Sequence, residues 1–122
     1  MTADMYVDRP RVLLVDDEKE VADAYALRLD AVADVTVTYS GPEALSAVDE
    51  SDPPDVILLD RHMPDRSGDD ILRELREHDI HTRVIMVTAI DPGLELLELP
   101  FDDYLCKPVD REDIRAAVDQ QC

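Results

Sequence analysis

The sequence has little lysine, little cysteine and no long hydrophobic segment. Only 2 lysines accompany 10 arginines, and these 12 basic residues face 30 acidic ones, which gives a formal net charge of −18. Because phosphate contacts need clustered positive charge, this composition excludes direct nucleic-acid binding and docking on anionic membranes. The 2 cysteines are too few for a disulfide framework. Cys106 lies in a largely apolar stretch and is expected to be a small buried hydrophobic residue.

Targeting signals are also missing. Residues 1–5 contain neither the basic region nor the apolar run of a signal peptide. The longest apolar stretch, residues 84–89, is far too short to cross a bilayer. We therefore expect a cytoplasmic protein with no membrane partner.

The acidic residues are mostly aspartates, with 21 Asp and 9 Glu. An Asp-rich, Lys-poor surface is typical of proteins in concentrated salt, where screening limits carboxylate repulsion to a few ångströms. We therefore expect a halophilic source. An acidic domain from a mesophile is the alternative, and melting in low salt and in molar KCl separates the two.

The length of 122 residues and the 45% apolar content fit one folded domain. A polar lead-in over residues 1–10 precedes it. Three short runs are apolar on both faces, as expected for buried parallel strands, and they cover residues 12–15, 56–59 and 84–87. The segments 35–39 and 101–106 mix polar and apolar residues, as edge strands do.

Amphipathic segments with recognisable start signals separate these strands. Ser40, Ser67 and Asp110 are the expected N-caps of three helices. Another helical face is expected for Val21, Tyr25, Leu29 and Val32. This alternation predicts an α/β fold, a doubly wound, flavodoxin-like sheet of five parallel strands in the order 2-1-3-4-5, with helices on both faces.

Three acidic residues stand where predicted strands end. Asp16 and Asp17 follow the first strand, and Asp60 follows the third. Aspartate makes up about 17% of the chain, so adjacent Asp pairs arise by chance, and only the position after a buried strand gives this pair meaning. Ligands of open α/β sheets bind at the carboxyl ends of strands where the strand order reverses, so these carboxylates should converge.

A convergent carboxylate cluster is costly unless a cation lies within it. Oxygen ligands without nearby His or Cys favour a hard cation, with Mg²⁺ first. On position alone, an N-capping cluster for the helix that begins near Glu18 is an equal alternative.

The other strand ends favour a phosphoryl site. The fourth strand ends at Thr88, and Lys107, one of the 2 lysines, follows the fifth. A hard cation, an ammonium group and a hydroxyl could together meet the three equatorial oxygens of a transferring phosphoryl group. Asp60 would then be the nucleophile and form an acyl phosphate.

These residues resemble the receiver domain of two-component response regulators, from about Arg11 to the end of the chain. The segments that carry the resemblance are Val12-Leu13-Leu14-Val15-Asp16-Asp17-Glu18, Asp60-Arg61-His62-Met63-Pro64 with Ser67-Gly68, Val87-Thr88-Ala89, and Asp103-Tyr104-Leu105-Cys106-Lys107-Pro108. Each is weak alone, but together and in this order they are specific.

The resemblance implies a role for each site residue. Asp60 is the implied phosphoacceptor, and Asp17, Asp60 and the backbone carbonyl of His62 are the implied Mg²⁺ ligands. Asp16 would orient water bound to the metal. The implied partners of the phosphoryl group are Lys107 and Thr88, and Tyr104 resembles the aromatic residue that turns inward when the threonine moves.

The sequence differs from the family pattern between Thr88 and Lys107, where it is about three residues shorter. We therefore expect a short or irregular fourth helix over residues 91–99, which bears on the usual dimer through this face and leaves the oligomeric state open. His62 and Ile90 are expected to influence the lifetime of the phosphate.

The predicted function is a phosphorylation-activated signalling switch rather than an enzyme, with a receiver domain over residues 11–122. Its partners would be a histidine kinase or phosphotransfer protein and a fused or separate output domain, absent or cut off after Cys122. The output would respond to the surface of the last helices and the fifth strand. Two alternatives are a receiver-like interaction module that is never phosphorylated and a small phosphohydrolase with an aspartate nucleophile.

Overall fold

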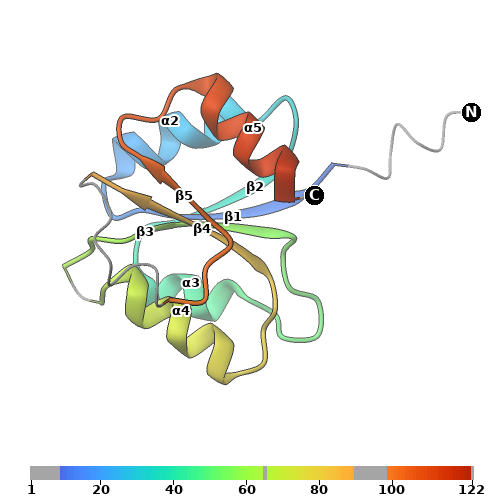
Figure 1. Cartoon of the computed structure of the whole chain (residues 1–122), viewed down its shortest axis with the longest axis vertical. Helices are drawn as coiled ribbons and strands as arrows, with labels where there is room; N and C mark the ends of the chain where they lie inside the picture. The colour runs from blue at the N-terminus through green and yellow to red at the C-terminus, as the bar shows by residue number, and fades with distance from the viewer. Residues whose placement is uncertain (1–8, 65, 90–98, 122) are drawn as a thin grey trace, which may run out of the picture.

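A computed structural model describes residues 9–64, 66–89 and 99–121 of the chain (Figure 1). The strands are β1 (Arg11–Val15), β2 (Asp34–Thr38), β3 (Val56–Asp60), β4 (Arg83–Thr88) and β5 (Asp103–Cys106). The helices of this described part are α2 (Lys19–Leu29), α3 (Gly41–Ala47), α4 (Gly68–Glu77) and α5 (Arg111–Gln121).

All strand pairings in the sheet are parallel, and the order β2-β1-β3-β4-β5 confirms the prediction. The register aligns Val15 with Leu59 and Asp60 with Val87, so β1, β3 and β4 end at the same edge. This edge is where the predicted site residues lie.

The helices cover both faces of the sheet, with α2 and α5 on one side and α3 and α4 on the other (Figure 1). Alternate residues of each central strand therefore enter different cores. Leu14 and Leu58 pack in the core beneath α2 and α5, whereas Leu13 and Ile57 pack in the core beneath α3 and α4. Burial on both sides explains why these strands are continuous apolar runs.

The predicted helix starts are confirmed. Side-chain oxygens accept backbone N–H bonds at three of them: Ser40 from Glu43 at 3.2 Å, Ser67 from Asp70 at 3.2 Å and Asp110 from Asp113 at 2.8 Å. The predicted face with Val21, Tyr25, Leu29 and Val32 is only partly right. Because α2 ends at Leu29, Val32 lies in the turn after it and is 39% exposed.

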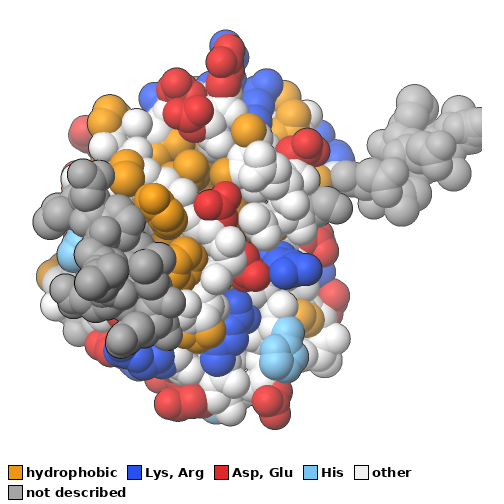
Figure 2. Space-filling model, viewed as in Figure 1, with side chains coloured by type: hydrophobic (Ala, Val, Ile, Leu, Met, Phe, Trp, Pro, Cys, Tyr) orange, Lys and Arg blue, Asp and Glu red, His pale blue; other side chains and the backbone are white. Residues whose placement is uncertain are grey.

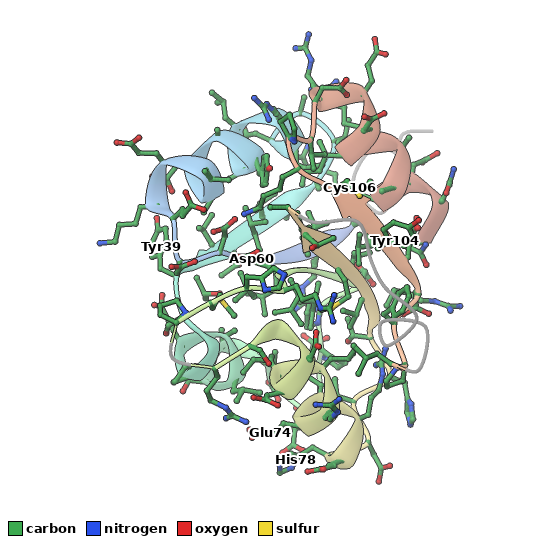
Figure 3. All side chains as sticks on the ribbon, turned by 60° about the vertical axis from the view of Figure 1, so that its left-hand side comes forward. Tyr39, Asp60, Glu74, His78, Tyr104 and Cys106 are labelled. Atoms are coloured by element: carbon green, nitrogen blue, oxygen red, sulfur yellow. The ribbon has the colours of Figure 1, made fainter. Side chains whose placement is uncertain are left out.

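The prediction that Cys106 is buried is wrong. β5 is an edge strand, and its side chains alternate between half-buried and exposed positions. Tyr104 and Cys106 occupy the exposed positions, and both lie on β5 in Figure 3. The apolar character of the local sequence did not reveal this alternation.

Some predictions fall on residues outside the described ranges. The short helix expected over residues 91–99, a different segment from α4, falls mainly on residues 91–98 and is one of these predictions. The others concern the role of Ile90, most of the lead-in and Cys122. Among the described helices, none has the length and apolar character needed to cross a bilayer.

Candidate functional site

The site lies at the carboxyl edge of the sheet, where four strands end near one another. Asp60 is the last residue of β3 and Thr88 is the last residue of β4. Asp16 and Asp17 directly follow β1, and Lys107 directly follows β5. Since the strands are parallel neighbours, residues far apart in the sequence meet here.

The three aspartates form one cluster. Each of Asp16, Asp17 and Asp60 offers a carboxylate oxygen, and these oxygens lie within 4.8 Å of one another. Asp16 is 1% exposed and Asp60 is 3% exposed, while Asp17 is half-buried. The strand ends therefore bring together the carboxylates that the sequence analysis grouped.

Lys107 supplies the positive charge of this cluster. Its Nζ donates to Asp16 Oδ2 at 3.0 Å and lies 3.5 Å from Asp60 Oδ1. The Lys107 amide donates to the Thr88 carbonyl at 2.7 Å, which fixes the chain directly after β5. Glu18 Oε1 lies 3.9 Å from the same Nζ, at the solvent side of the cluster.

Burial and charge raise the pKa of Asp60 to about 7 from its ordinary value of 3.8. Loss of solvation is the largest cause, and the neighbouring Asp16 carboxylate adds to it, while Lys107 and the His62 amide act in the opposite direction. For Lys107, burial favours the neutral amine. The hydrogen bond to Asp16 and the negative charges of Asp60 and Asp16 outweigh that effect, so the pKa of Lys107 is raised.

The donor set fits a hard divalent cation. Three carboxylates face one close ammonium group, which leaves excess negative charge in a mostly buried site. Carboxylate oxygens are preferred ligands of Mg²⁺. The His62 amide lies 3.4 Å from Asp60 Oδ1, so the backbone of the next residues also borders the cluster.

The alternative of a simple N-capping cluster accounts for only part of this arrangement. Asp16 Oδ1 accepts a hydrogen bond from the Glu18 amide at 3.0 Å, directly before α2. Asp60 comes from a different strand and has no part in that helix start. Capping therefore explains one contact of Asp16 and leaves the convergence of the three carboxylates unexplained.

Thr88 and Tyr104 lie in different environments. Thr88 is fully buried at the end of β4. Tyr104 is 41% exposed and packs edge-to-face with Phe101, with their ring centroids 6.4 Å apart. Figure 3 places Tyr104 on β5, to the side of Asp60.

Two features at this edge have no counterpart among the predictions from the sequence. Glu18 ends the first segment that carries the resemblance and stands near an expected helix start, but neither position indicates that it lies near Lys107. An ion pair between Arg61 and Asp69 also lies beside Asp60, with Nε of Arg61 3.1 Å from Oδ1 of Asp69. A basic and an acidic residue eight positions apart across a loop have no periodic signature, so no pattern in the sequence indicated this pair.

Comparisons with known proteins agree with the geometry. The family model described as response regulator receiver domain matches residues 12–119. A candidate transcriptional regulator of Haloferax volcanii is 44% identical over 110 residues, which cover 89% of this chain and 19% of that protein. The transcriptional regulatory protein CutR of Streptomyces coelicolor is 43% identical over 113 residues, which cover 88% of this chain and 51% of CutR. The chain thus spans about a fifth to a half of these relatives.

Solved structures give the same result. The receiver domain of the Francisella response regulator 1452 has a TM-score of 0.84 and 33% identity, and the match covers 93% of this chain and 96% of that one. A BeF3-activated receiver domain of DrrB has a TM-score of 0.81 and 27% identity, over 93% and 97% of the two chains. The Haloferax relative also agrees with the expectation of a high-salt habitat.

Proposed function

This chain belongs to the response regulator receiver domain family, and from that membership we propose that it is a phosphorylation-activated switch with Asp60 as the phosphoacceptor. Proteins of this family act in two-component signal transduction, and receiver domains generally use Mg²⁺. The observation that carries the proposal is the buried Asp60 carboxylate beside two further aspartates and the Lys107 ammonium group.

In the proposed reaction, an oxygen of the ionised Asp60 carboxylate attacks the phosphorus of a phosphohistidine on a kinase or phosphotransfer protein. The new O–P bond forms as the N–P bond breaks, and the imidazole nitrogen keeps the electron pair and takes up a proton. Lys107 is 3.5 Å from Asp60 Oδ1, close enough to pair with a phosphoryl oxygen after transfer. Thr88 lies at the end of the neighbouring strand β4, and its hydroxyl would donate a hydrogen bond to another phosphoryl oxygen.

The residues proposed to hold Mg²⁺ are Asp17, Asp60 and the carbonyl of His62, with Asp16 orienting bound water. When bound, the ion would offset the charges of the carboxylates and of the phosphoryl oxygens. The protein would assist its own phosphorylation and dephosphorylation without turning over a separate substrate.

The proposed response is a shift between two populations of one surface. Contacts that exist only with phosphoryl-Asp60 would draw Thr88 toward the phosphate, and the exposed Tyr104 ring would turn inward behind it. The surface of β5 and α5 would change as a result. A fused or separate output domain would then respond to that surface in the cytoplasm.

Incubation with acetyl phosphate and Mg²⁺, followed by intact mass measurement, tests the acceptor. We expect an adduct of about 80 Da that EDTA prevents and that Asp60→Asn abolishes. Circular dichroism of the variant checks that it is folded. Absence of an adduct in every condition would indicate a receiver-like interaction module, and rapid turnover of many phosphoesters would indicate a phosphohydrolase.

The 2 lysines of the chain provide a matched test of the phosphoryl partner. Lys107→Gln should slow adduct formation by at least about tenfold, because the transferring charge loses its ammonium partner. Lys19 lies over the Tyr39 ring at 5.3 Å, so Lys19→Gln removes the same charge on another side chain. Equal rates for the two variants would refute the role of Lys107.

A further inference from the structure

We propose that the ion pair between Arg61 and Asp69 is a positioning device that holds the acceptor turn, defined here as residues 60–62, in the geometry needed for metal binding and phosphorylation. This inference rests on the proposed function, since it assigns to the pair a role in that same site. Neither residue touches the reacting group; both act through the backbone of the turn.

The backbone of the turn is held between β4 and α4. The Arg61 amide donates to the Val87 carbonyl at 2.8 Å, and the Arg61 carbonyl accepts from the Gly68 amide at 2.9 Å. Gly68 is the first residue of α4 and packs directly on the turn, because a Cβ there would overlap the carbonyl oxygen of Asp60. The position of α4 therefore bears on the position of the acceptor.

The Arg61 side chain adds a third link between the turn and α4. Its Nε lies 3.1 and 3.3 Å from the two carboxylate oxygens of Asp69, and Nη2 lies 3.3 Å from Oδ2. The two side chains are only 14% and 20% exposed. Outside the Lys107 cluster, this is the most enclosed ion pair among the described residues. Paired, partly buried charges of this kind are screened by salt much less than exposed ones.

The start of α4 does not need this carboxylate. Ser67 already caps the helix, and Asp70 places a second negative charge in the first turn. Asp69 instead projects its carboxylate to Arg61, the residue directly after the acceptor. Because Ser67 and Asp70 already stabilise the start of α4, we infer that the ion pair between Asp69 and Arg61 stabilises the turn rather than the helix.

Loss of the pair should loosen the turn and move the His62 carbonyl, which directly follows Arg61. Residues that orient a metal ligand from behind typically change metal affinity by roughly 10- to 100-fold when they are lost. We therefore expect Arg61→Gln and Asp69→Asn each to weaken Mg²⁺ binding about tenfold. The double variant should be no weaker than either single one, because both remove the same interaction.

Neighbouring residues give matched controls. Asp70 and Arg73 form an exposed pair on α4, with side chains 54% and 57% exposed. Asp70→Asn removes the same charge from the same helix turn as Asp69→Asn, and Arg73→Gln matches Arg61→Gln. The conservative Asp69→Glu should recover most of the lost affinity, which a general loss of stability would not allow.

Three measurements complete the test: Mg²⁺ affinity by calorimetry, the rate of phosphorylation by acetyl phosphate, and amide hydrogen exchange of Arg61 and Gly68 in the metal-free protein. We expect faster exchange at these two amides, weaker Mg²⁺ binding and slower phosphorylation in Arg61→Gln and Asp69→Asn, at a urea midpoint close to that of the controls. If these variants match Asp70→Asn and Arg73→Gln in all three, the inference is wrong. If the unaltered protein forms no adduct, the proposed function fails, while hydrogen exchange and metal affinity still decide whether the pair holds the turn.

Discussion

At the scale of single residues, Asp60 stands out among the described residues because its pKa is raised far above the ordinary value. Its raised pKa of about 7 comes first from burial and then from the Asp16 carboxylate. In the unfolded chain, the pKa of this carboxyl is near its ordinary value of 3.8. Between about pH 4 and about pH 7, the folded protein therefore keeps a proton on Asp60 that the unfolded chain has already lost. The free energy of unfolding contributed by this group falls as pH rises from about 4 to about 7, and stays level above that.

This gives a prediction for the metal-free protein. Asp60→Asn removes the titrating group, so its free energy of unfolding relative to the unaltered protein should rise by roughly 2 kcal/mol between about pH 5 and about pH 8. Urea denaturation in molar KCl with EDTA measures the difference at both pH values. Asp70→Asn, which removes an exposed carboxylate, should show no such rise, and parallel behaviour of the two variants would contradict the raised pKa of Asp60.

At the scale of elements, the starts of α3 and α4 differ in what they pack against. Both helices begin with glycine. A Cβ at Gly41 would meet the end of the flexible Ile71 side chain, with Cδ1 at 2.6 Å. A Cβ at Gly68 would instead meet backbone, including the Arg61 Cα at 2.9 Å and the Asp60 carbonyl oxygen. Backbone at the end of a central strand cannot move aside as a methyl group can.

Two matched substitutions test this contrast. Gly68→Ala should lower the free energy of unfolding by roughly 2 kcal/mol, although alanine is the better helix former, because the added methyl group forces α4 away from the acceptor turn. Gly41→Ala should change stability by less than about 1 kcal/mol, since the Ile71 side chain can rotate. Urea denaturation of both variants measures this. A Gly68→Ala protein as stable as the unaltered one would show that the close approach at α4 is not required.

At the scale of the whole molecule, the net charge of −18 dominates the surface. Acidic and basic side chains are interspersed over the face in Figure 2. Several described ion pairs are largely exposed, such as Arg11–Asp52 with side chains 49% and 73% exposed, and such pairs contribute little. Repulsion between unpaired carboxylates should therefore exceed local pairing at low ionic strength.

The corresponding prediction concerns salt. Raising KCl from low to molar concentration should raise Tm by an amount on the order of 10 °C, because screening weakens the repulsion among surface carboxylates more than it weakens the enclosed contacts. Thermal melts followed by circular dichroism across a KCl series measure this shift. An unchanged Tm would contradict adaptation to high salt and favour an acidic protein from an ordinary environment.

The sequence by itself determined the elements and their order. Apolar runs on both faces identified the three central strands, and Ser40, Ser67 and Asp110 marked helix starts. Parallel strands in an alternating chain leave few arrangements, so the position of Asp16, Asp17 and Asp60 at one edge followed as well. Periodicity and capping are local properties, and a sequence displays local properties directly.

Only the tertiary structure decided how these elements meet. Lys107 Nζ donates to Asp16, a residue 91 positions away, and loss of solvation in the folded protein is the largest cause of the raised pKa of Asp60. The exposure of Cys106 and the pairing of Arg61 with Asp69 were also decided at this level. Distances between side chains on different elements depend on how those elements pack against one another, and no local pattern along the chain specifies these distances.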